Sequence, residues 1–77
     1  MFEYIICTVA DEDIFLKQCD ALEKYIPKIQ KGLLLIDVDN SKIQEYFIDE
    51  KRLTVHNSYY LNTVYIKSEI DINIFFK

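Results

Sequence analysis

The sequence contains one glycine, Gly32, one proline, Pro27, and no tryptophan. A single glycine excludes a glycine-rich loop of the kind that cradles phosphate groups. The scarcity of both chain breakers indicates short, tight connections between helices and strands. The longest uninterrupted aliphatic run, Leu33 to Ile36, is far too short to cross a bilayer. We therefore expect neither a phosphate-binding loop nor a contact with membrane.

Cysteine is also scarce, because Cys7 and Cys19 are the only two in the chain. Two cysteines are too few for a secreted disulfide framework, and their spacing fits no zinc or redox motif. Glu3 and the lack of a basic N-terminal stretch argue against a signal peptide. We expect core thiols in a cytoplasmic protein that uses no metal and no cofactor.

Basic residues are outnumbered, 9 against 13 acidic ones, which gives a net charge of −4. Proteins that bind nucleic acid rely on basic side chains to displace counterions from phosphates. An acidic protein is better suited to a basic protein partner, because opposite potentials steer association. The charge balance thus disfavours nucleic acid and favours a basic protein as partner.

What the sequence has in abundance is apolar patterning, which is strongest from Val64 to Phe76. Its even positions are apolar except for Ser68, and most of its odd positions are polar or acidic. Alternation with period two places successive side chains on opposite faces of a strand. The stretch predicts one long strand, or two strands that meet near Ser68, with one face packed on the core.

The first half of the chain predicts a β-α-β unit. In Phe2 to Val9, apolar residues occupy both odd and even positions, which is typical of a central strand with both faces partly covered. A helix is expected from Asp11, a suitable N-cap, to Ile26, since the residue before Pro27 avoids the helical region. Leu33 to Val38 then forms an apolar run typical of an interior strand. If the two strands share a parallel sheet, the crossover should be right-handed.

The predicted helix has one apolar stripe, with residues at steps of four, three and four: Phe15, Cys19, Leu22 and Ile26. A stripe of this kind docks on a sheet. We expect it to face the isoleucines of the last stretch, Ile70, Ile72 and Ile74.

The segment Lys42 to Arg52 has two readings. Ser41 and Gln44 form a possible capping box at the start of a helix. The alternative is a hairpin of strands over Gln44 to Ile48 and Arg52 to His56 that turns at Asp49-Glu50-Lys51, and we favour it. Strands over Tyr59 to Lys67 and Glu69 to Phe76 would complete an antiparallel meander. The chain, residues 1–77, is therefore predicted to be a single α+β domain, a two-layer sandwich with one helix on one face of the sheet.

The stretch Leu34 to Ser41 ends in Asp37-Val38-Asp39-Asn40-Ser41 and resembles the opening motif of haloacid-dehalogenase-type phosphatases. That resemblance implies a nucleophilic Asp37 and an acid–base Asp39 beside magnesium. Those enzymes need a larger domain with a downstream lysine and further aspartates, which a chain of 77 residues cannot hold. An EF-hand is excluded because its sixth and twelfth positions are Lys42 and Ile48. We expect the two aspartates to form a turn, where at most a weak magnesium site remains.

No other catalytic arrangement emerges from the sequence, and we expect the protein not to be an enzyme. His56 is the only histidine and lies at the end of a predicted strand, where a structural or exposed role is usual. Cys7 lies in an apolar run, where burial raises the pKa of a thiol and lowers its reactivity.

Tyrosine is abundant, with six residues in the chain. This side chain suits binding surfaces, because one end can be dry while the other is wet. We predict a partner-binding surface that combines aromatic and acidic side chains, namely Tyr59, Tyr60, Tyr65, Asp49, Glu50, Glu69 and Asp71.

In general character the chain is similar to bacterial immunity proteins, which are small, acidic and α+β. That similarity implies a cytoplasmic inhibitor or antitoxin that binds and neutralises a basic toxin such as a nuclease. Two alternatives remain open: a homo-oligomeric structural or adaptor subunit that pairs through an exposed strand edge, and a phage-encoded acidic inhibitor of a host nucleic-acid enzyme.

Overall fold

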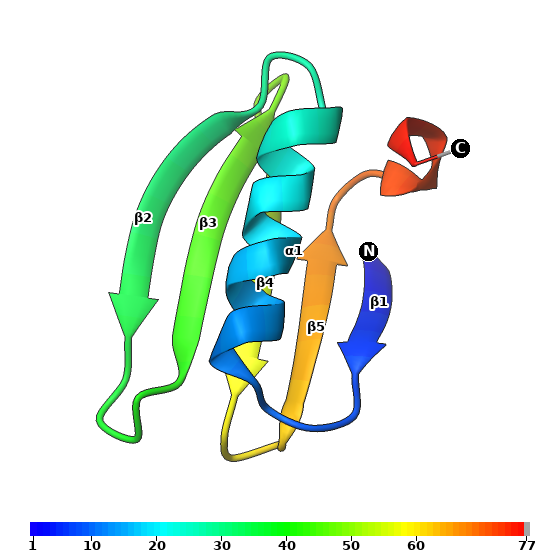
Figure 1. The fold of residues 1–77 in the computed structure, drawn as a ribbon. Coiled ribbons are helices and arrows are strands. Elements are labelled where there is room, and N and C mark those ends of the chain that lie inside the picture. Colours follow the sequence, from blue (N-terminus) through cyan, green and yellow to red (C-terminus); the bar gives the residue numbers. More distant parts are fainter. Residues whose placement is uncertain (77) are drawn as a thin grey trace.

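The computed structural model describes residues 1–76, which form one helix packed on a five-stranded antiparallel sheet (Figure 1). Along the chain the elements are β1 (Phe2–Cys7), α1 (Glu12–Tyr25), β2 (Gln30–Ile36), β3 (Lys42–Ile48), β4 (Lys51–Ser58), β5 (Thr63–Ser68) and a 3-10 turn, η1 (Ile72–Phe75). The predicted two-layer α+β sandwich, with a β-α-β start and a meander, is confirmed.

Helix α1 forms where the sequence predicts it. The Asp11 carboxylate accepts a hydrogen bond from the Ile14 backbone N–H at 3.1 Å, which caps the first turn. The helix ends at Tyr25, and Ile26 is already extended ahead of Pro27. The predicted stripe is buried, with Leu22 fully inaccessible. Burial of an aliphatic side chain of this size contributes about 1.5–3 kcal/mol to folding.

The covered face of the sheet meets this stripe with side chains from the three middle strands. These are Tyr46 and Ile48 of β3, Leu53 and Val55 of β4, and Val64 and Ile66 of β5. Tyr46 is fully buried, and its hydroxyl donates to a carboxylate oxygen of Glu23 on α1 at 2.7 Å. Burial and this hydrogen bond raise the pKa of Tyr46. The core therefore lies between α1 and strands β3, β4 and β5.

The strand order, β1-β5-β4-β3-β2, corrects two predictions. The strands β1 and β2 run in the same direction, but three strands separate them, and each forms an edge of the sheet (Figure 1). Neither is the central or interior strand that its apolar composition predicts. Helix α1 carries the chain across the whole covered face between them, and the crossover is right-handed (Figure 1).

The hairpin prediction for Lys42 to Arg52 is confirmed, and the helical alternative is wrong. Strands β3 and β4 pair without interruption from Lys42 and Asn57 to Ile48 and Lys51. Asp49 and Glu50 form the two-residue turn with positive φ values of 48° and 68°. These values fit the type I′ geometry that matches the twist of a hairpin.

The strand predicted for Glu69 to Phe76 is wrong. Strand β5 ends at Ser68, whose hydroxyl accepts a hydrogen bond from the Ile70 N–H at 3.1 Å. Asp71 then accepts from the Asn73 N–H at 3.0 Å and caps η1. Of the three isoleucines expected against the helix, Ile72 is buried and Ile70 is partly buried, whereas Ile74 is 62% exposed.

Candidate functional site

The face of the sheet opposite α1, called the open face below, is not covered by any element in residues 1–76. One row of side chains crosses it, because the residues are direct partners in four successive ladders. From β2 to β1 this transverse row is Leu35, Ile43, His56, Tyr65 and Ile5. Its outer members are well exposed, Leu35 at 47% and Ile5 at 66%. A row of aliphatic and aromatic side chains therefore crosses all five strands, partly buried at its centre and exposed at both ends.

The centre of the transverse row is a stacked pair of rings. The rings of His56 and Tyr65 have centroids 4.4 Å apart and planes inclined by 5°. The Nε2 atom of His56 is 2.7 Å from the Thr54 hydroxyl. Burial and the nearby charges of Lys67 and Arg52 lower the pKa of His56 to about 4. The imidazole is thus neutral at pH 7 and belongs to a half-buried aromatic surface.

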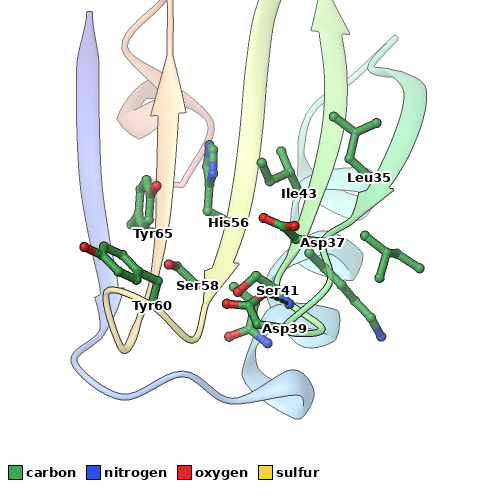
Figure 2. Close-up of a pocket in the computed structure, with 12 residues that line it drawn as sticks. Leu35, Asp37, Asp39, Ser41, Ile43, His56, Ser58, Tyr60 and Tyr65 are labelled. Carbon is green, nitrogen blue, oxygen red and sulfur yellow. Dashed lines mark hydrogen bonds between the residues drawn. The ribbon is translucent and has the colours of Figure 1, made fainter.

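The transverse row leads into a shallow groove of about 370 Å³ at the end of the sheet where β2 turns into β3 (Figure 2). Asp37, Asp39 and Ser41 of the β2–β3 turn lie on one side of this groove, and Tyr60 of the β4–β5 turn lies on the other. Tyr60 is 90% exposed. The groove combines an apolar floor with carboxylates at its rim.

Both aspartates of the groove form turn structure, as predicted. Asp37 accepts from the Val38 N–H at 2.7 Å, and Asp39 accepts from the Ser41 N–H at 2.9 Å. Hydrogen bonds from the backbone and the hydroxyl of Ser41 lower the pKa of Asp39. Asp39 is therefore ionised at neutral pH. Among the described residues that line this groove, Lys42 is the only lysine or arginine, and its ammonium pairs with Glu12 of α1.

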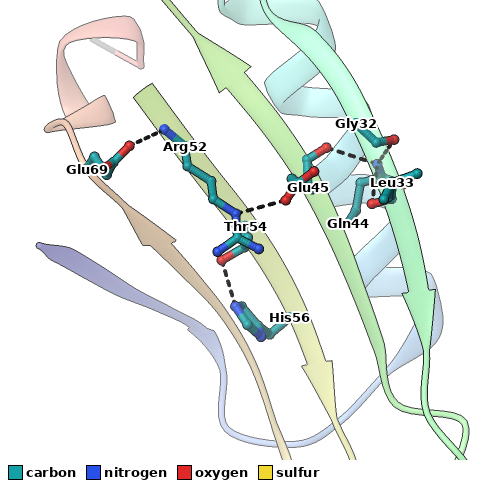
Figure 3. A network of polar contacts seen from close by, with 8 residues as sticks. All are labelled: Gly32, Leu33, Gln44, Glu45, Arg52, Thr54, His56 and Glu69. Carbon is teal, nitrogen blue, oxygen red and sulfur yellow. Dashed lines mark hydrogen bonds and ion pairs between the residues drawn. The ribbon is translucent and has the colours of Figure 1, made fainter. Parts of the chain in front are cut away.

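A band of charged side chains borders the transverse row on the side away from the groove (Figure 3). The Nε atom of Arg52 lies 2.9 Å from a carboxylate oxygen of Glu45. The ammonium nitrogen of Lys67 lies 3.7 Å from a carboxylate oxygen of Glu3. The backbone N–H of Arg52 also donates to the carboxylate of Glu69. Most charges in this band are matched within the chain, so it is less suited than the groove to attract a charged partner.

The predicted partner-binding residues fall into two groups. Tyr59 and Tyr60 lie in the β4–β5 turn, and Tyr65 lies in the transverse row. The four acidic residues lie at the other end of the sheet: Asp49 and Glu50 in the β3–β4 turn, Glu69 and Asp71 after β5. Asp71 accepts from the Tyr4 hydroxyl at 2.7 Å and caps η1, which is a structural role.

Asp37 and Asp39 are the acidic residues that lie beside the exposed tyrosine, and the sequence interpretation did not include them in the binding surface. Leu35, Ile43 and Ile5 were missed as well. The available signal was the strand count, because in an antiparallel meander the β2–β3 and β4–β5 turns must meet at the same end of the sheet. The apolar edge residues were instead assigned to interior strands.

Neither metal chemistry nor thiol chemistry finds support among residues 1–76. No group of three or more potential ligands from His, Cys, Asp and Glu is close enough there to hold a metal ion. Cys7 is a half-buried free thiol, and Cys19 is buried with a raised pKa caused by that burial. Within the same residues, no helix has the length and hydrophobicity needed to span a bilayer.

Comparison of the chain with protein-family models, curated proteins and solved structures gave no match. The geometry of the open face is therefore the basis for assigning a function.

Proposed function

We propose that this protein binds a basic partner protein through its open face and acts by occupying that partner's surface. The observation that carries the proposal is the transverse row, which places an apolar or aromatic side chain of every strand on the open face and leaves Leu35 and Ile5 exposed. Contiguous exposed apolar surface with a polar rim is typical of protein-interaction sites.

Charge supports a basic partner. The chain has a net charge of −4, and the groove adds Asp37 and Asp39 at one end of the apolar row. A lysine or arginine of the partner would meet these carboxylates while apolar side chains cover Leu35 and Ile43. Charges of this kind raise the association rate more than they prolong the complex.

Aromatic side chains support a specific complex. Tyr60 is almost fully exposed beside the groove, and Tyr59 is 45% exposed in the same turn. An exposed tyrosine loses little conformational entropy when it is buried, and tyrosines are enriched among the residues that dominate binding energy. Tyr65 is held in place by His56 and offers a preorganised surface.

Inhibition is the finer proposal. An acidic surface with an apolar centre would mask the basic, substrate-binding surface of a nuclease by competing for it. An immunity protein or antitoxin acts in this way without a reaction of its own.

The experiment is affinity capture from the source organism, followed by identification of the bound protein. Ile43→Lys places a charge in the transverse row, whereas Leu16→Lys makes the same change at a residue of α1 that is 50% exposed. We expect the wild type and Leu16→Lys to capture one basic protein that Ile43→Lys loses. Capture of an acidic protein, or equal capture by both variants, would contradict the proposal.

A further inference from the structure

Strand β2, which has a free edge, is the most apolar of the exposed strands in residues 1–76. Leu33, Leu34, Leu35 and Ile36 are 47–68% exposed, although they follow one another on a strand. Natural sheets protect their edges with charges, prolines, short strands or a covering segment. None of Leu33 to Ile36 is charged or a proline, and no described element lies beyond this edge.

The opposite edge is protected. Each edge strand carries one charge and one irregular step, Glu3 and the step from Ile5 to Cys7 in β1, Lys31 and the step from Lys31 to Leu34 in β2, so the difference lies elsewhere. The C-terminal segment is tied to β1, because the Tyr4 hydroxyl donates to Asp71 and accepts from the Ile72 N–H at 3.1 Å. The two edges therefore differ, and β2 is the one open to further pairing.

The β2–β3 turn determines which backbone groups of β2 are free. The Asp37 N–H donates to the Ser41 carbonyl at 2.9 Å, so Asp37 points its N–H toward β3. Hydrogen-bonded positions alternate along an antiparallel strand. The backbone N–H and C=O groups of Leu35, which is paired with Ile43, therefore also point toward β3. The N–H and C=O groups of Leu34 and Ile36 point to the free edge.

We propose that two copies of this chain pair through β2 to form one continuous ten-stranded sheet. A two-fold axis normal to the sheet leaves every side chain on the same face in both copies. Residues that lie opposite each other must therefore have their side chains on the same face of the sheet. Centring the axis on Leu35 places Leu34 opposite Ile36 of the second copy, and Ile36 opposite its Leu34. Both pairs consist of residues with outward backbone groups, which gives four hydrogen bonds between the copies.

The side chains fit this register. Leu35 lies opposite Leu35 of the second copy on the open face, so the transverse row continues across the axis into the other sheet. On the other face leucine meets isoleucine, and these central pairs bring no like charges together. A register centred on Leu33 would carry the pairing into the irregular stretch between Lys31 and Leu34, and one centred on Asp37 would place Leu35 opposite Asp39 of the second copy.

The regular part of β2 is short, and one strand edge buries less than the roughly 800 Å² per partner of a standard interface. We therefore expect a reversible dimer with a dissociation constant in the micromolar range. A two-fold pairing uses up both β2 edges, so assembly stops at the dimer.

Sedimentation velocity over rising concentration tests the dimer. The wild type should shift from monomer to dimer. Leu34→Pro removes an outward N–H without removing a bond to β3, and it should stay monomeric at concentrations at least tenfold higher. Thermal unfolding verifies that this variant is folded. A wild type that remains monomeric at millimolar concentration, or that forms open-ended aggregates, would overturn the proposal.

Cysteine cross-linking tests the register independently. In a Cys7→Ser background, Leu35→Cys places two thiols on residues that face each other in a non-hydrogen-bonded pair, about 4.5 Å apart at Cα, which a disulfide can bridge. Leu33→Cys is the matched control, because Leu33 is more exposed, 68% against 47%. With oxidised glutathione, Leu35→Cys should cross-link at least tenfold faster. Equal rates, or faster cross-linking of Leu33→Cys, would contradict the register centred on Leu35.

Discussion

The imidazole ring of His56 lies parallel to the phenol ring of Tyr65, with the two ring centroids 4.4 Å apart. The residues are direct partners on β4 and β5 and form the centre of the transverse row. This stacking fixes an aromatic surface in the middle of a face that no element of residues 1–76 covers. The pair also gives that face a measurable pH dependence.

Folding lowers the pKa of His56 from 6.5 to about 4, mainly through burial. The stability that comes from the neutral ring is complete above the unfolded pKa and is lost as the pH falls from about 6.5 to 4. The loss is at most roughly 3 kcal/mol, and less after screening, because the ring is only half buried. Denaturant unfolding of wild type and His56→Phe across this range measures it. If the free energies of unfolding of the two proteins changed in parallel with pH, the pKa of His56 would not differ between the folded and unfolded states.

Leu22→Ala should lower the free energy of unfolding by about 2–5 kcal/mol, because the side chain is fully buried between α1 and the sheet. Leu16→Ala, on the same helix but 50% exposed, should cost less than about 0.5 kcal/mol. Urea denaturation compares the two variants. Equal costs would mean that α1 is docked by another face.

Gly32→Ala should destabilise the protein by roughly 1 kcal/mol. A Cβ atom at Gly32 would lie 2.8 Å from the Glu45 carboxylate and 3.2 Å from the Glu45 carbonyl oxygen. The carboxylate must move, which disturbs its ion pair with Arg52 (Figure 3). The cost should shrink when Glu45→Ala is already present. An unchanged cost in this double-mutant cycle would place the strain in the backbone contact instead.

Association with the captured partner should slow as ionic strength rises, because salt screens the attraction between opposite charges. Asp37→Asn with Asp39→Asn should reduce the association rate roughly two- to tenfold. Tyr60→Ala should instead raise the dissociation rate, since aromatic anchors act mainly after encounter. Stopped-flow binding at two salt concentrations separates these effects. A salt-independent association rate would remove the argument for a basic partner.

The helix and the β3–β4 hairpin could be predicted because local chemistry specifies them. Asp11 caps the first turn of α1, Pro27 prevents its continuation, and Asp49 and Glu50 form a two-residue turn. Each signal lies within a few residues of the boundary that it sets, so no knowledge of strand order is needed.

The edges of the sheet could not be predicted in this way. An apolar run such as Leu33 to Ile36 is typical of an interior strand, yet it lies at an edge because α1 crosses the entire sheet. The alternation after Ser68 also misled the prediction, since Asp71 caps a 3-10 turn in the middle of it. Composition reports how apolar a segment is, whereas position in the sheet depends on the whole topology.

The candidate site was predicted in part for the same reason. Tyr59, Tyr60 and Tyr65 were predicted from the abundance of tyrosine, and Tyr60 is the most exposed of these three. Their acidic neighbours are Asp37 and Asp39, which only the strand order brings to them.

Nuclear magnetic resonance tests whether the open face binds the partner. Amide chemical shifts of the labelled protein are recorded while the captured partner is added. We expect the largest changes at Ile43, His56, Tyr65 and the β2–β3 turn, with small changes on the exposed side of α1. Changes concentrated on α1, with the open face unaffected, would contradict the claim.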